Sequence, residues 1–410
     1  MSDNVLIIGA GQAGAQTAIF LRQNHFTGSI TVIGDEAYVP YERPPLSKGF
    51  LAGDVEIERM SMRPPSFYAD KGIDLRLKTA VLHIDRVQKT IGLANGEVLS
   101  YGKLVLATGG RVRRMISPGT ELPGVHYLRN VDDVLGFRDR LTAGARVVIV
   151  GGGYIGLEVA AVAVKRGCKV TVLEMMPLVL NRVVAPEMSR FYEKVHRDAG
   201  VDVRTSETVS GFEGKGRLAR VRCSDGTAID ADLAVIGIGI VPNVELAVEA
   251  GLPVDNGIVV DECARTNDPD IYAAGDCTNH PSRVSGERLR LESVPNALGQ
   301  GKAAALAIVG APVPYDEVPW FWSDQYDLKL QMAGISKPGD QVVIRGVVDA
   351  RKFSACYLRD GVFVACQAVN MAKDFLQSKK LISHRVRPDP SLLADANTPL
   401  QAFLPDAAGG

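Results

Sequence analysis

Closely spaced cysteines are missing from this sequence. Its six cysteines lie at positions 168, 223, 263, 277, 356 and 366, and no two are closer than ten positions. Structural zinc sites and small disulfide frameworks depend on cysteines at short, regular spacings. We therefore expect no metal site, reduced thiols and a cytoplasmic protein.

An excess of charge and long apolar runs are also missing. The 46 basic and 47 acidic side chains give a net charge of -1, which argues against general nucleic-acid binding. No apolar run is long enough to span a membrane, and the N-terminus has none of the features of a signal peptide. The hydrophobic share of 46% is typical of a soluble globular protein, and 410 residues suffice for two or three domains.

Two glycine-rich segments, residues 5–14 and 147–156, each begin with a short apolar run that predicts a buried parallel strand. Both contain Gly-x-Gly-x-x-Gly, at Gly9, Gly11 and Gly14 in the first and at Gly151, Gly153 and Gly156 in the second. The first glycine permits a tight turn, the second lets the backbone approach a pyrophosphate, and the third lets helix pack on strand. We call these segments the first and second cradles, and they predict two dinucleotide sites.

An acidic residue indicates which nicotinamide dinucleotide to expect at the second cradle. The predicted strand that follows it ends at Glu174, 18 residues after Gly156. A carboxylate there can accept hydrogen bonds from the adenosine ribose and would repel a 2′-phosphate. The sequence therefore predicts NADH rather than NADPH. Tyr154, Ile155 and Gly239 complete the predicted NAD site.

The first cradle has its acid one position later. Gly34 stands where the second unit has Glu174, and Asp35 follows, with Glu36 as the alternative ligand of the ribose. A further predicted strand ends at Gly275 and Asp276, where a carboxylate could accept from a ribityl hydroxyl. These features favour FAD at the first cradle.

The rest of the sequence predicts a change of fold near Trp320. Strands are expected at 29–33 and 103–109, and a helix over 295–309. Beyond Trp320, antiparallel strands are expected over 328–333, 341–348, 353–358 and 362–369, followed by a helix over 370–382.

These motifs resemble those of the FAD- and NAD-binding pyridine nucleotide oxidoreductases. The two cradles, residues 43–48 (Arg-Pro-Pro-Leu-Ser-Lys), 107–110 (Ala-Thr-Gly-Gly) and 274–276 (Ala-Gly-Asp) carry the resemblance. Residues 292–297 and 319–325 narrow it to ferredoxin reductases of oxygenase systems, of the putidaredoxin reductase type.

The resemblance implies an α/β fold with two Rossmann-like, glutathione-reductase-like domains and a C-terminal α+β domain with an antiparallel sheet. The expected boundaries are 1–109 and 240–318 for the FAD domain, 110–239 for the inserted NAD domain and 319–410 for the C-terminal domain. It also implies FAD contacts at Ala13, Asp35, Arg43, Lys48, Val81, Arg129, Asp276 and Val294, and it places Asn296 and Trp322 near the flavin or the partner.

Residues 38–50 contain no cysteine, whereas disulfide-reducing relatives place a cysteine pair beside the flavin there. We therefore expect electrons to leave the flavin for an external carrier. The implied enzyme is an FAD-dependent NADH:ferredoxin oxidoreductase that reduces a 2Fe-2S ferredoxin of a heme monooxygenase or related oxygenase. A rubredoxin or nitrite-reductase-linked reductase, or a redox-gated binding protein like apoptosis-inducing factor, is the alternative.

Two charged residues are expected beside the flavin. Lys48 would stabilise negative charge developing on the ring, and Glu158 would hold Lys48 and help seat the nicotinamide. The alternative is that the two side chains never meet.

A basic segment is the expected docking surface for an acidic ferredoxin. Residues 370–387 carry Lys373, Lys379, Lys380, Arg385 and Arg387 against one acid, Asp374. Such a surface would steer a transient partner electrostatically, although an ordinary solvated face has the same composition. The protein itself is expected to be a monomer or a weak dimer.

Overall fold

The computed structural model describes residues 3–405, which divide into two compact units. The first unit comprises the residues up to Glu42, Glu58–Arg111 and Val241–Phe321. The second comprises Arg43–Ile57, Val112–Ile240 and the residues from Trp322 onward. Borders between the units fall within α3 (Ile57–Met60), β8 (Gly110–Val112), β17 (Ile240–Pro242) and β22 (Trp320–Gln325). Both units are therefore discontinuous in sequence.

The first unit is built on a five-stranded parallel sheet with the order β19-β7-β1-β2-β3. Its strands are β1 (Asn4–Ile8), β2 (Ser29–Ile33), β3 (Ile73–Arg76), β7 (Lys103–Leu106) and β19 (Ile271–Ala273). β2 and β7 lie on opposite sides of β1. The carboxyl end of β1 is therefore a topological switch point, where ligands bind in sheets of this type.

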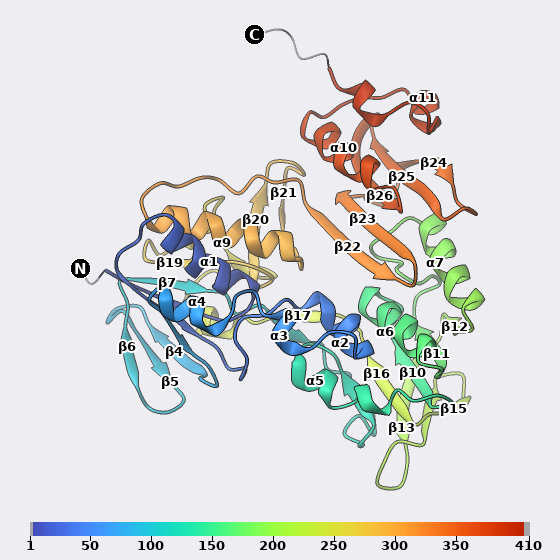
Figure 1. Ribbon diagram of the computed structural model, residues 1–410, viewed down its shortest axis with the longest axis horizontal. Helices are drawn as coiled ribbons and strands as arrows, with labels where there is room; N and C mark the ends of the chain where they lie inside the picture. The colour runs from blue at the N-terminus through green and yellow to red at the C-terminus, as the bar shows by residue number, and fades with distance from the viewer. Residues whose placement is uncertain (1–2, 406–410) are drawn as a thin grey trace. The chain divides into compact units, whose positions relative to one another are not determined.

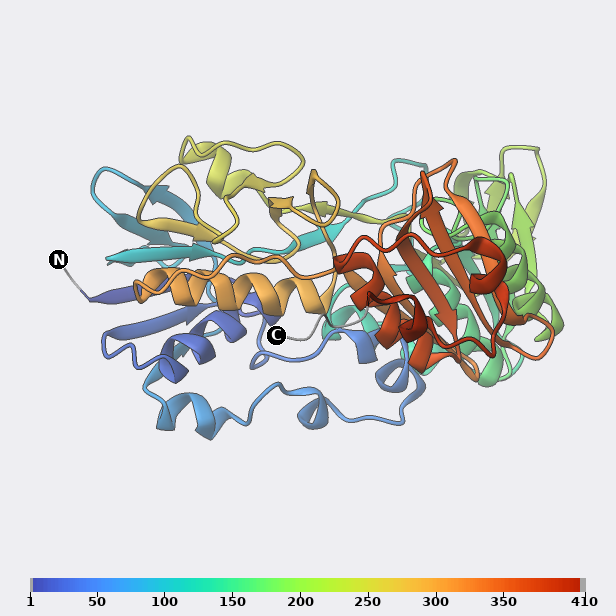
Figure 2. The same cartoon turned by 90° about the horizontal axis from the view of Figure 1, so that it is seen from above.

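Helices α1 (Gln12–Gln23) and α9 (Val294–Ile308) pack together against this sheet (Figures 1 and 2). Strand side chains alternate between faces, so Val5 and Ile7 join the core cluster of these helices. Leu6 and Ile8 join a second cluster, on the other face. The two helices approach closely, because a Cβ on Gly301 would lie only 2.9 Å from the Ala13 carbonyl oxygen.

Smaller elements complete the first unit. One three-stranded sheet contains β4 (Val81–Asp85), β5 (Thr90–Leu93) and β6 (Val98–Ser100), and another contains β18 (Ile258–Val259), β20 (Thr278–Ser282) and β21 (Glu287–Leu289). The short helices are α4 (Pro65–Asp70) and α8 (Glu245–Glu249).

The second unit repeats the architecture. Its parallel sheet has the order β12-β11-β10-β16-β9. The central strand is β10, which corresponds to β1 in the first unit. The strands are β9 (Val125–Tyr127), β10 (Arg146–Val150), β11 (Lys169–Glu174), β12 (Asp202–Thr205) and β16 (Leu233–Ile236). Helices α6 (Tyr154–Lys165) and α7 (Pro186–Asp198) pack beside this sheet. The carboxyl end of β10 is the equivalent switch point.

The second unit also contains shorter elements. They are η1 (Pro44–Ser47), α2 (Gly49–Ala52), α5 (Val131–Leu135), η2 (Arg138–Arg140) and the sheet of β13 (Val209–Glu213), β14 (Arg220–Cys223) and β15 (Ala228–Asp230).

A five-stranded sheet forms the C-terminal part of the chain, with the order β22-β23-β26-β25-β24. Its other strands are β23 (Leu328–Gly334), β24 (Gln341–Val347), β25 (Lys352–Arg359) and β26 (Val362–Val369), and the helices α10 (Ala372–Ser383), α11 (Pro390–Ala394) and η3 (Leu400–Phe403) follow. The pairs β23–β26, β25–β26 and β24–β25 are antiparallel, and α10 packs on β26 and β23.

The predicted α/β fold with a C-terminal antiparallel sheet is confirmed. Three details are wrong: residues 320–325 form a strand that was not predicted, the strand predicted over 103–109 ends at Leu106, and α10 begins at Ala372 rather than Asn370. Asn370 has a φ of 53°, and its side chain accepts from Lys329 N–H, so it forms the turn before the helix. The predicted boundaries at 109/110, 239/240 and 318/319 stay predictions.

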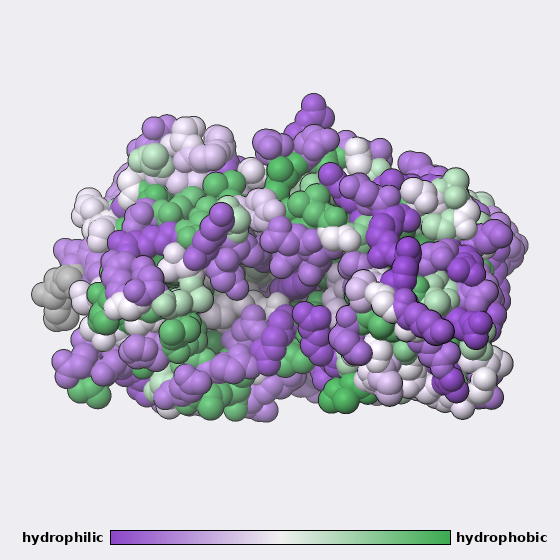
Figure 3. Space-filling model, turned by 90° about the horizontal axis from the view of Figure 1, so that it is seen from below, coloured by the Kyte–Doolittle hydropathy of each residue, from purple (hydrophilic) through white to green (hydrophobic). Residues whose placement is uncertain are grey.

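Hydrophilic side chains cover much of the face in Figure 3, and hydrophobic ones are scattered among them. Among residues 3–405, no helix combines the length and the apolar character needed to cross a bilayer.

Candidate dinucleotide sites

The turn of the first cradle is shaped by its three glycines. Gly9 has a φ of +113°, and a Cβ on Gly14 would lie 1.9 Å from the Gly9 carbonyl oxygen. Gly11 is different, because its φ is -84° and a Cβ there would meet no atom within 4 Å. The fold therefore requires Gly9 and Gly14, whereas the space beside Gly11 is open to a ligand.

The second cradle repeats this geometry closely. Gly151 has a φ of +109°, and a Cβ on Gly156 would lie 2.1 Å from the Gly151 carbonyl oxygen. A Cβ on Gly153 would again meet nothing within 4 Å. The predicted equivalence of the two glycine patterns thus extends to the space around each glycine.

The helix after each cradle begins without a side-chain cap. Gly11 and Gly153 occupy the N-cap positions of α1 and α6, so neither provides an oxygen for the first backbone N–H groups. By contrast, α5 begins with a capping box formed by Asn130 and Asp133. Uncapped N–H groups and the helix dipole favour an anion at both cradles, and the pyrophosphate of a dinucleotide fits there.

Glu174 lies at the end of β11 beside the second cradle. Its Oε2 accepts from Gly152 N–H at 2.7 Å, and its Oε1 accepts from Met176 N–H at 2.8 Å. These bonds fix the carboxylate next to the glycine turn. Each carboxylate oxygen has a second lone pair, so acceptor capacity remains for the hydroxyls of a ribose. The geometry suits the predicted role of Glu174, which stays a prediction.

The acids of the first unit are arranged differently. Asp35 is exposed after β2, whereas the Glu36 carboxylate accepts from the Tyr41 hydroxyl at 2.6 Å. The tyrosine contact engages one oxygen of Glu36. Asp35, the predicted ligand, is therefore accessible to a ribose, and its contact with the ribose stays a prediction, with Glu36 as the alternative.

Gly275 and Asp276, after β19, lie beside the start of α1. A Cβ on Gly275 would lie 3.0 Å from the Ala13 Cβ, so only glycine allows this approach. The Gly275 N–H donates to Gln300 Oε1 at 2.7 Å, which orders the turn that carries Asp276. Gln300 was not predicted, and its buried Nε2 has no protein partner. Asp276 is thus held near the first cradle, as a ribityl ligand requires.

The N-terminal end of α9 presents an unsatisfied acceptor. Asn296 is 1% exposed, its Nδ2 donates to Leu291 O, and its buried Oδ1 has no protein partner. Val294, a predicted FAD contact, is the first residue of the same helix. A buried polar atom without a partner is costly, and a bound cofactor would satisfy it. These observations fit FAD at the first unit.

The remaining predicted FAD contacts belong to other elements. Val81 begins β4 in the first unit. In the second unit, Arg43 Nη1 donates to the Arg129 carbonyl oxygen at 2.8 Å, so these two residues are neighbours. Their contact with FAD stays a prediction.

Lys48 and Glu158 do meet. Lys48 Nζ lies 2.7 Å from Glu158 Oε2, and the Glu158 side chain is only 2% exposed. Glu158 also accepts from two serines: Ser47 Oγ to Oε2 at 2.5 Å and Ser323 Oγ to Oε1 at 2.6 Å. A buried ion pair needs such additional donors to offset its desolvation. Neither serine was predicted, although Ser47 directly precedes Lys48 in the sequence.

The other residues predicted for the NAD site lie around the second cradle. Tyr154 Oη contacts Met332 Sδ at 2.9 Å, and Ile155 is 42% exposed. Gly239 has a φ of +98°, and its carbonyl accepts from Arg113 N–H. Their contacts with NAD stay predictions.

The basic segment at α10 has no exposed acid to offset it. Asp374 is 4% exposed and pairs with the buried Arg345 at 2.9 Å. Lys373 and Lys380 are exposed and lie about two helical turns apart, whereas Lys379 Nζ lies over the Phe375 ring. The exposed part of α10 is therefore more basic than the sequence count indicates.

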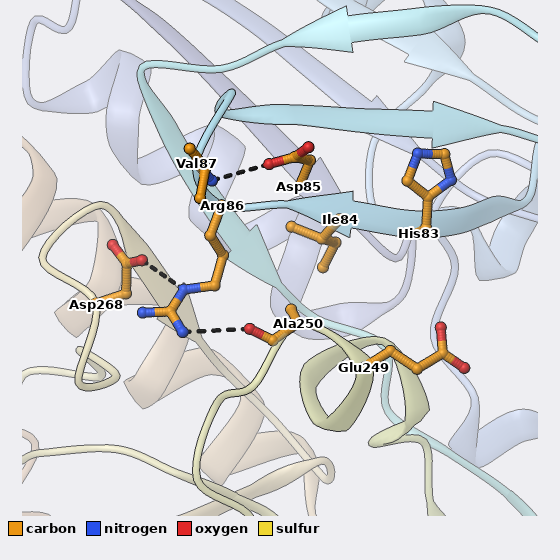
Figure 4. Close-up of a pocket in the computed structure, with 8 residues that line it drawn as sticks. All are labelled: His83, Ile84, Asp85, Arg86, Val87, Glu249, Ala250 and Asp268. Carbon is orange, nitrogen blue, oxygen red and sulfur yellow. Dashed lines mark hydrogen bonds and ion pairs between the residues drawn. The ribbon is translucent and has the colours of Figure 1, made fainter.

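A hollow on the first unit contains none of the predicted site residues (Figure 4). It is lined by His83, Arg86, Glu249 and Asp268 among others. Arg86 donates to Asp268 Oδ2 at 2.8 Å and to the Ala250 carbonyl oxygen at 3.2 Å. These contacts join the turn after β4 to the segments around Ala250 and Asp268, which is a structural role.

Comparison with known proteins matches nearly the whole chain. The pyridine nucleotide-disulphide oxidoreductase family matches residues 3–301, and the reductase C-terminal family matches residues 320–404. Putidaredoxin reductase CamA of Pseudomonas putida is 44% identical, over 98% of this chain and 97% of that protein. A rubredoxin-NAD(+) reductase of the same species is 38% identical, over 90% of this chain and 96% of that protein.

Solved structures are similar to this chain in fold over nearly its whole length. The crystal structure of the covalent putidaredoxin reductase–putidaredoxin complex contains a chain with a TM-score of 0.95 and 43% identity, covering 98% of this chain and 97% of that one. A ferredoxin reductase for the CYP199A2 system of Rhodopseudomonas palustris has the same TM-score at 41% identity, covering 98% and 100%.

Proposed function

Because the chain belongs to the pyridine nucleotide-disulphide oxidoreductase family, we propose that it is an FAD-dependent NADH:ferredoxin oxidoreductase. It delivers electrons to a 2Fe-2S ferredoxin that feeds a heme monooxygenase or related oxygenase. The observation that carries this proposal is the pair of matching cradles, each with an uncapped helix and an open space at its second glycine. Relatives that are named as reductases of such systems support it.

Different residues of the chain bind FAD and NADH. The first cradle, Asp35 and Asp276 hold FAD, and the second cradle with Glu174 holds NADH. The chemistry that bound FAD supplies is acceptance of a hydride and release of electrons one at a time. Lys48 provides a positive charge for the reacting ring, and Glu158 fixes its ammonium group at 2.7 Å.

A ferredoxin docks on the exposed bases of α10. Because the only acid of the segment is buried against Arg345, Lys373 and Lys380 present unopposed charge to an acidic partner. The resulting complex is transient, and the reductase itself is a monomer or weak dimer. Its six free cysteines agree with a cytoplasmic location.

The test is reduction of a panel of purified carriers under NADH. We expect a 2Fe-2S ferredoxin to be reduced at least about tenfold faster than oxygen or rubredoxin. Faster reduction of rubredoxin would instead favour the second candidate, a rubredoxin reductase, which a relative at 38% identity supports. A nitrite-reductase-linked acceptor is tested in the same panel, and lack of turnover with every carrier would favour a redox-gated binding protein.

A further inference from the structure

A continuous line of hydrogen bonds runs from Glu158 to the surface of the second unit. Glu158 Oε1 accepts from Ser323 Oγ at 2.6 Å, and Ser323 Oγ lies 3.2 Å from Gln325 Nε2. Gln325 Oε1 lies 2.8 Å from His196 Nε2, and His196 Nδ1 lies 2.9 Å from the Tyr326 hydroxyl. We call these five residues, Glu158, Ser323, Gln325, His196 and Tyr326, the relay.

The relay joins elements that are distant in sequence. Glu158 lies on α6, Ser323 and Gln325 on β22, and His196 on α7. Ser323 and Gln325 are two positions apart, so the strand points both toward the same face. The interior members are at most 2% exposed, and only Tyr326, at 37%, reaches solvent. Water therefore cannot replace a lost bond easily.

Chemistry fixes the direction of every bond. A carboxylate only accepts, so Ser323 must donate its single proton to Glu158 and can only accept from Gln325. The Gln325 amide nitrogen then faces Ser323, and its oxygen faces His196, which must donate through Nε2. Nδ1 is left to accept from the Tyr326 hydroxyl. All four donors thus point toward Glu158.

Burial is consistent with this arrangement. It lowers the pKa of His196 from 6.5 to about 4, so the imidazole is neutral at pH 7, with one donor and one acceptor nitrogen. The amide of Gln325 does not pass protons readily, because it would have to form an imidic acid. The relay is therefore suited to orienting and polarising groups and not to conducting protons.

We propose that Ser323, Gln325 and His196 are positioning residues, which hold the Glu158 carboxylate in the orientation that fixes Lys48. Aligned bonds polarise one another, and the last of them holds Oε1, so that Oε2 remains directed at Ser47 and Lys48. The link to the flavin rests on the proposed function, whereas the direction of the relay does not.

The first experiment needs no substitution. In the FAD-loaded protein with ¹⁵N-labelled histidine, we expect His196 to carry its proton on Nε2 and not to titrate between about pH 5.5 and 8. His196→Gln identifies its signals. A proton on Nδ1, or titration in this range, would overturn the proposed direction, whatever the electron acceptor of the enzyme is.

The second experiment tests the effect on Glu158 and Lys48. Ser323→Ala removes the last donor, and we expect single-turnover flavin reduction by NADH to slow about tenfold with FAD content unchanged. Ser323→Thr keeps the hydroxyl and should restore the rate to within about twofold. The matched control is Ser378→Ala, because Ser378 is equally buried and donates to the Phe375 carbonyl oxygen instead. Equal slowing in Ser323→Ala and Ser378→Ala would overturn the positioning role.

A third variant reverses the chemistry in the middle of the relay. When ionised, the carboxylate of Gln325→Glu provides only acceptors, so it should draw a second proton onto His196 and make the imidazole cationic at pH 7. Gln367→Glu is the control, since Gln367 is also buried and accepts from a tyrosine, Tyr357, at 2.6 Å. Nitrogen chemical shifts of His196 that are unchanged in Gln325→Glu would contradict the inferred contact between their side chains.

Discussion

The two cradles share a backbone geometry, and one of their differences is an exchange of side chains between the glycine turn and the end of the next strand. Gly9 N–H donates to the Ile33 carbonyl at 2.7 Å, and Gly151 N–H donates to the Leu173 carbonyl at 2.8 Å. The first cradle then has Ala10 opposite Gly34, whereas the second has Gly152 opposite Glu174. A Cβ on Gly34 would lie 2.6 Å from the Ala10 Cβ, so only one of the two positions can carry a side chain.

This exchange has a functional consequence. In the second cradle, the missing Cβ of Gly152 lets the Glu174 carboxylate reach the turn and accept its N–H. In the first, Ala10 occupies that space, and the acid is displaced to the exposed Asp35. The same fold therefore places the two predicted ribose ligands, Asp35 and Glu174, at different positions.

The largest effects are expected from Gly→Ala variants of the cradles, which distinguish the glycines that the fold requires from those that the ligand requires. A Cβ on Gly11 or Gly153 would meet no atom within 4 Å, so Gly11→Ala and Gly153→Ala should leave the unfolding temperature of the FAD-free protein almost unchanged. Gly11→Ala should lose FAD affinity by about a hundredfold or more, and Gly153→Ala should lose NADH affinity alone. FAD fluorescence and NADH titration measure both.

Gly14→Ala and Gly156→Ala are the matched variants. Their Cβ atoms would lie 1.9 and 2.1 Å from carbonyl oxygens, so we expect destabilisation by several kcal/mol, seen as a lower unfolding temperature. Normal stability of Gly14→Ala, or unchanged FAD affinity of Gly11→Ala, would contradict the roles that we assign to these glycines in both cradles.

The next effect concerns the acid itself. Glu174→Ala should narrow the preference for NADH over NADPH by about tenfold, because the charge that repels a 2′-phosphate is lost. Glu174→Gln retains the size and one acceptor and separates the effect of charge from that of shape. Steady-state kcat/KM for both nucleotides measures it, and an unchanged ratio in both variants would reject the assignment.

A smaller effect is expected at the docking surface. Lys373→Glu with Lys380→Glu should raise the KM for ferredoxin about fivefold at low salt and leave ferricyanide reduction unchanged. Lys215→Glu, an exposed reversal between β13 and β14, is the control. Equal loss with ferredoxin and ferricyanide would show that the helix is damaged and not that docking is impaired.

The smallest expected effect is on the pH dependence of stability, to which a buried histidine in each unit contributes. Burial lowers the pKa of both His280 and His196 from 6.5 to about 4. The unfolded chain binds more protons in this interval, so stability is complete above about pH 6.5 and falls as the pH approaches 4. His280→Gln should reduce the pH dependence of the unfolding temperature. An unchanged slope would mean that His280 is not buried as a neutral group.

The sequence was informative where function depends on local geometry. Both cradles, the end of β11 at Glu174 and the turn at Asp276 follow from short patterns, because a few adjacent residues determine each turn. Contacts between distant residues could not be predicted in this way. Ser323 lies 165 positions from Glu158, and only the fold brings them together. The one local signal was the pair of polar residues, Ser323 and Gln325, on one face of an aromatic-rich segment.

The most direct test is the absorption spectrum of the purified protein before and after anaerobic NADH. The two-cradle account predicts a yellow protein whose flavin band bleaches with about one equivalent of NADH and hardly at all with NADPH. A colourless protein that FAD cannot reconstitute, or a yellow protein that NADH leaves unchanged, would contradict it.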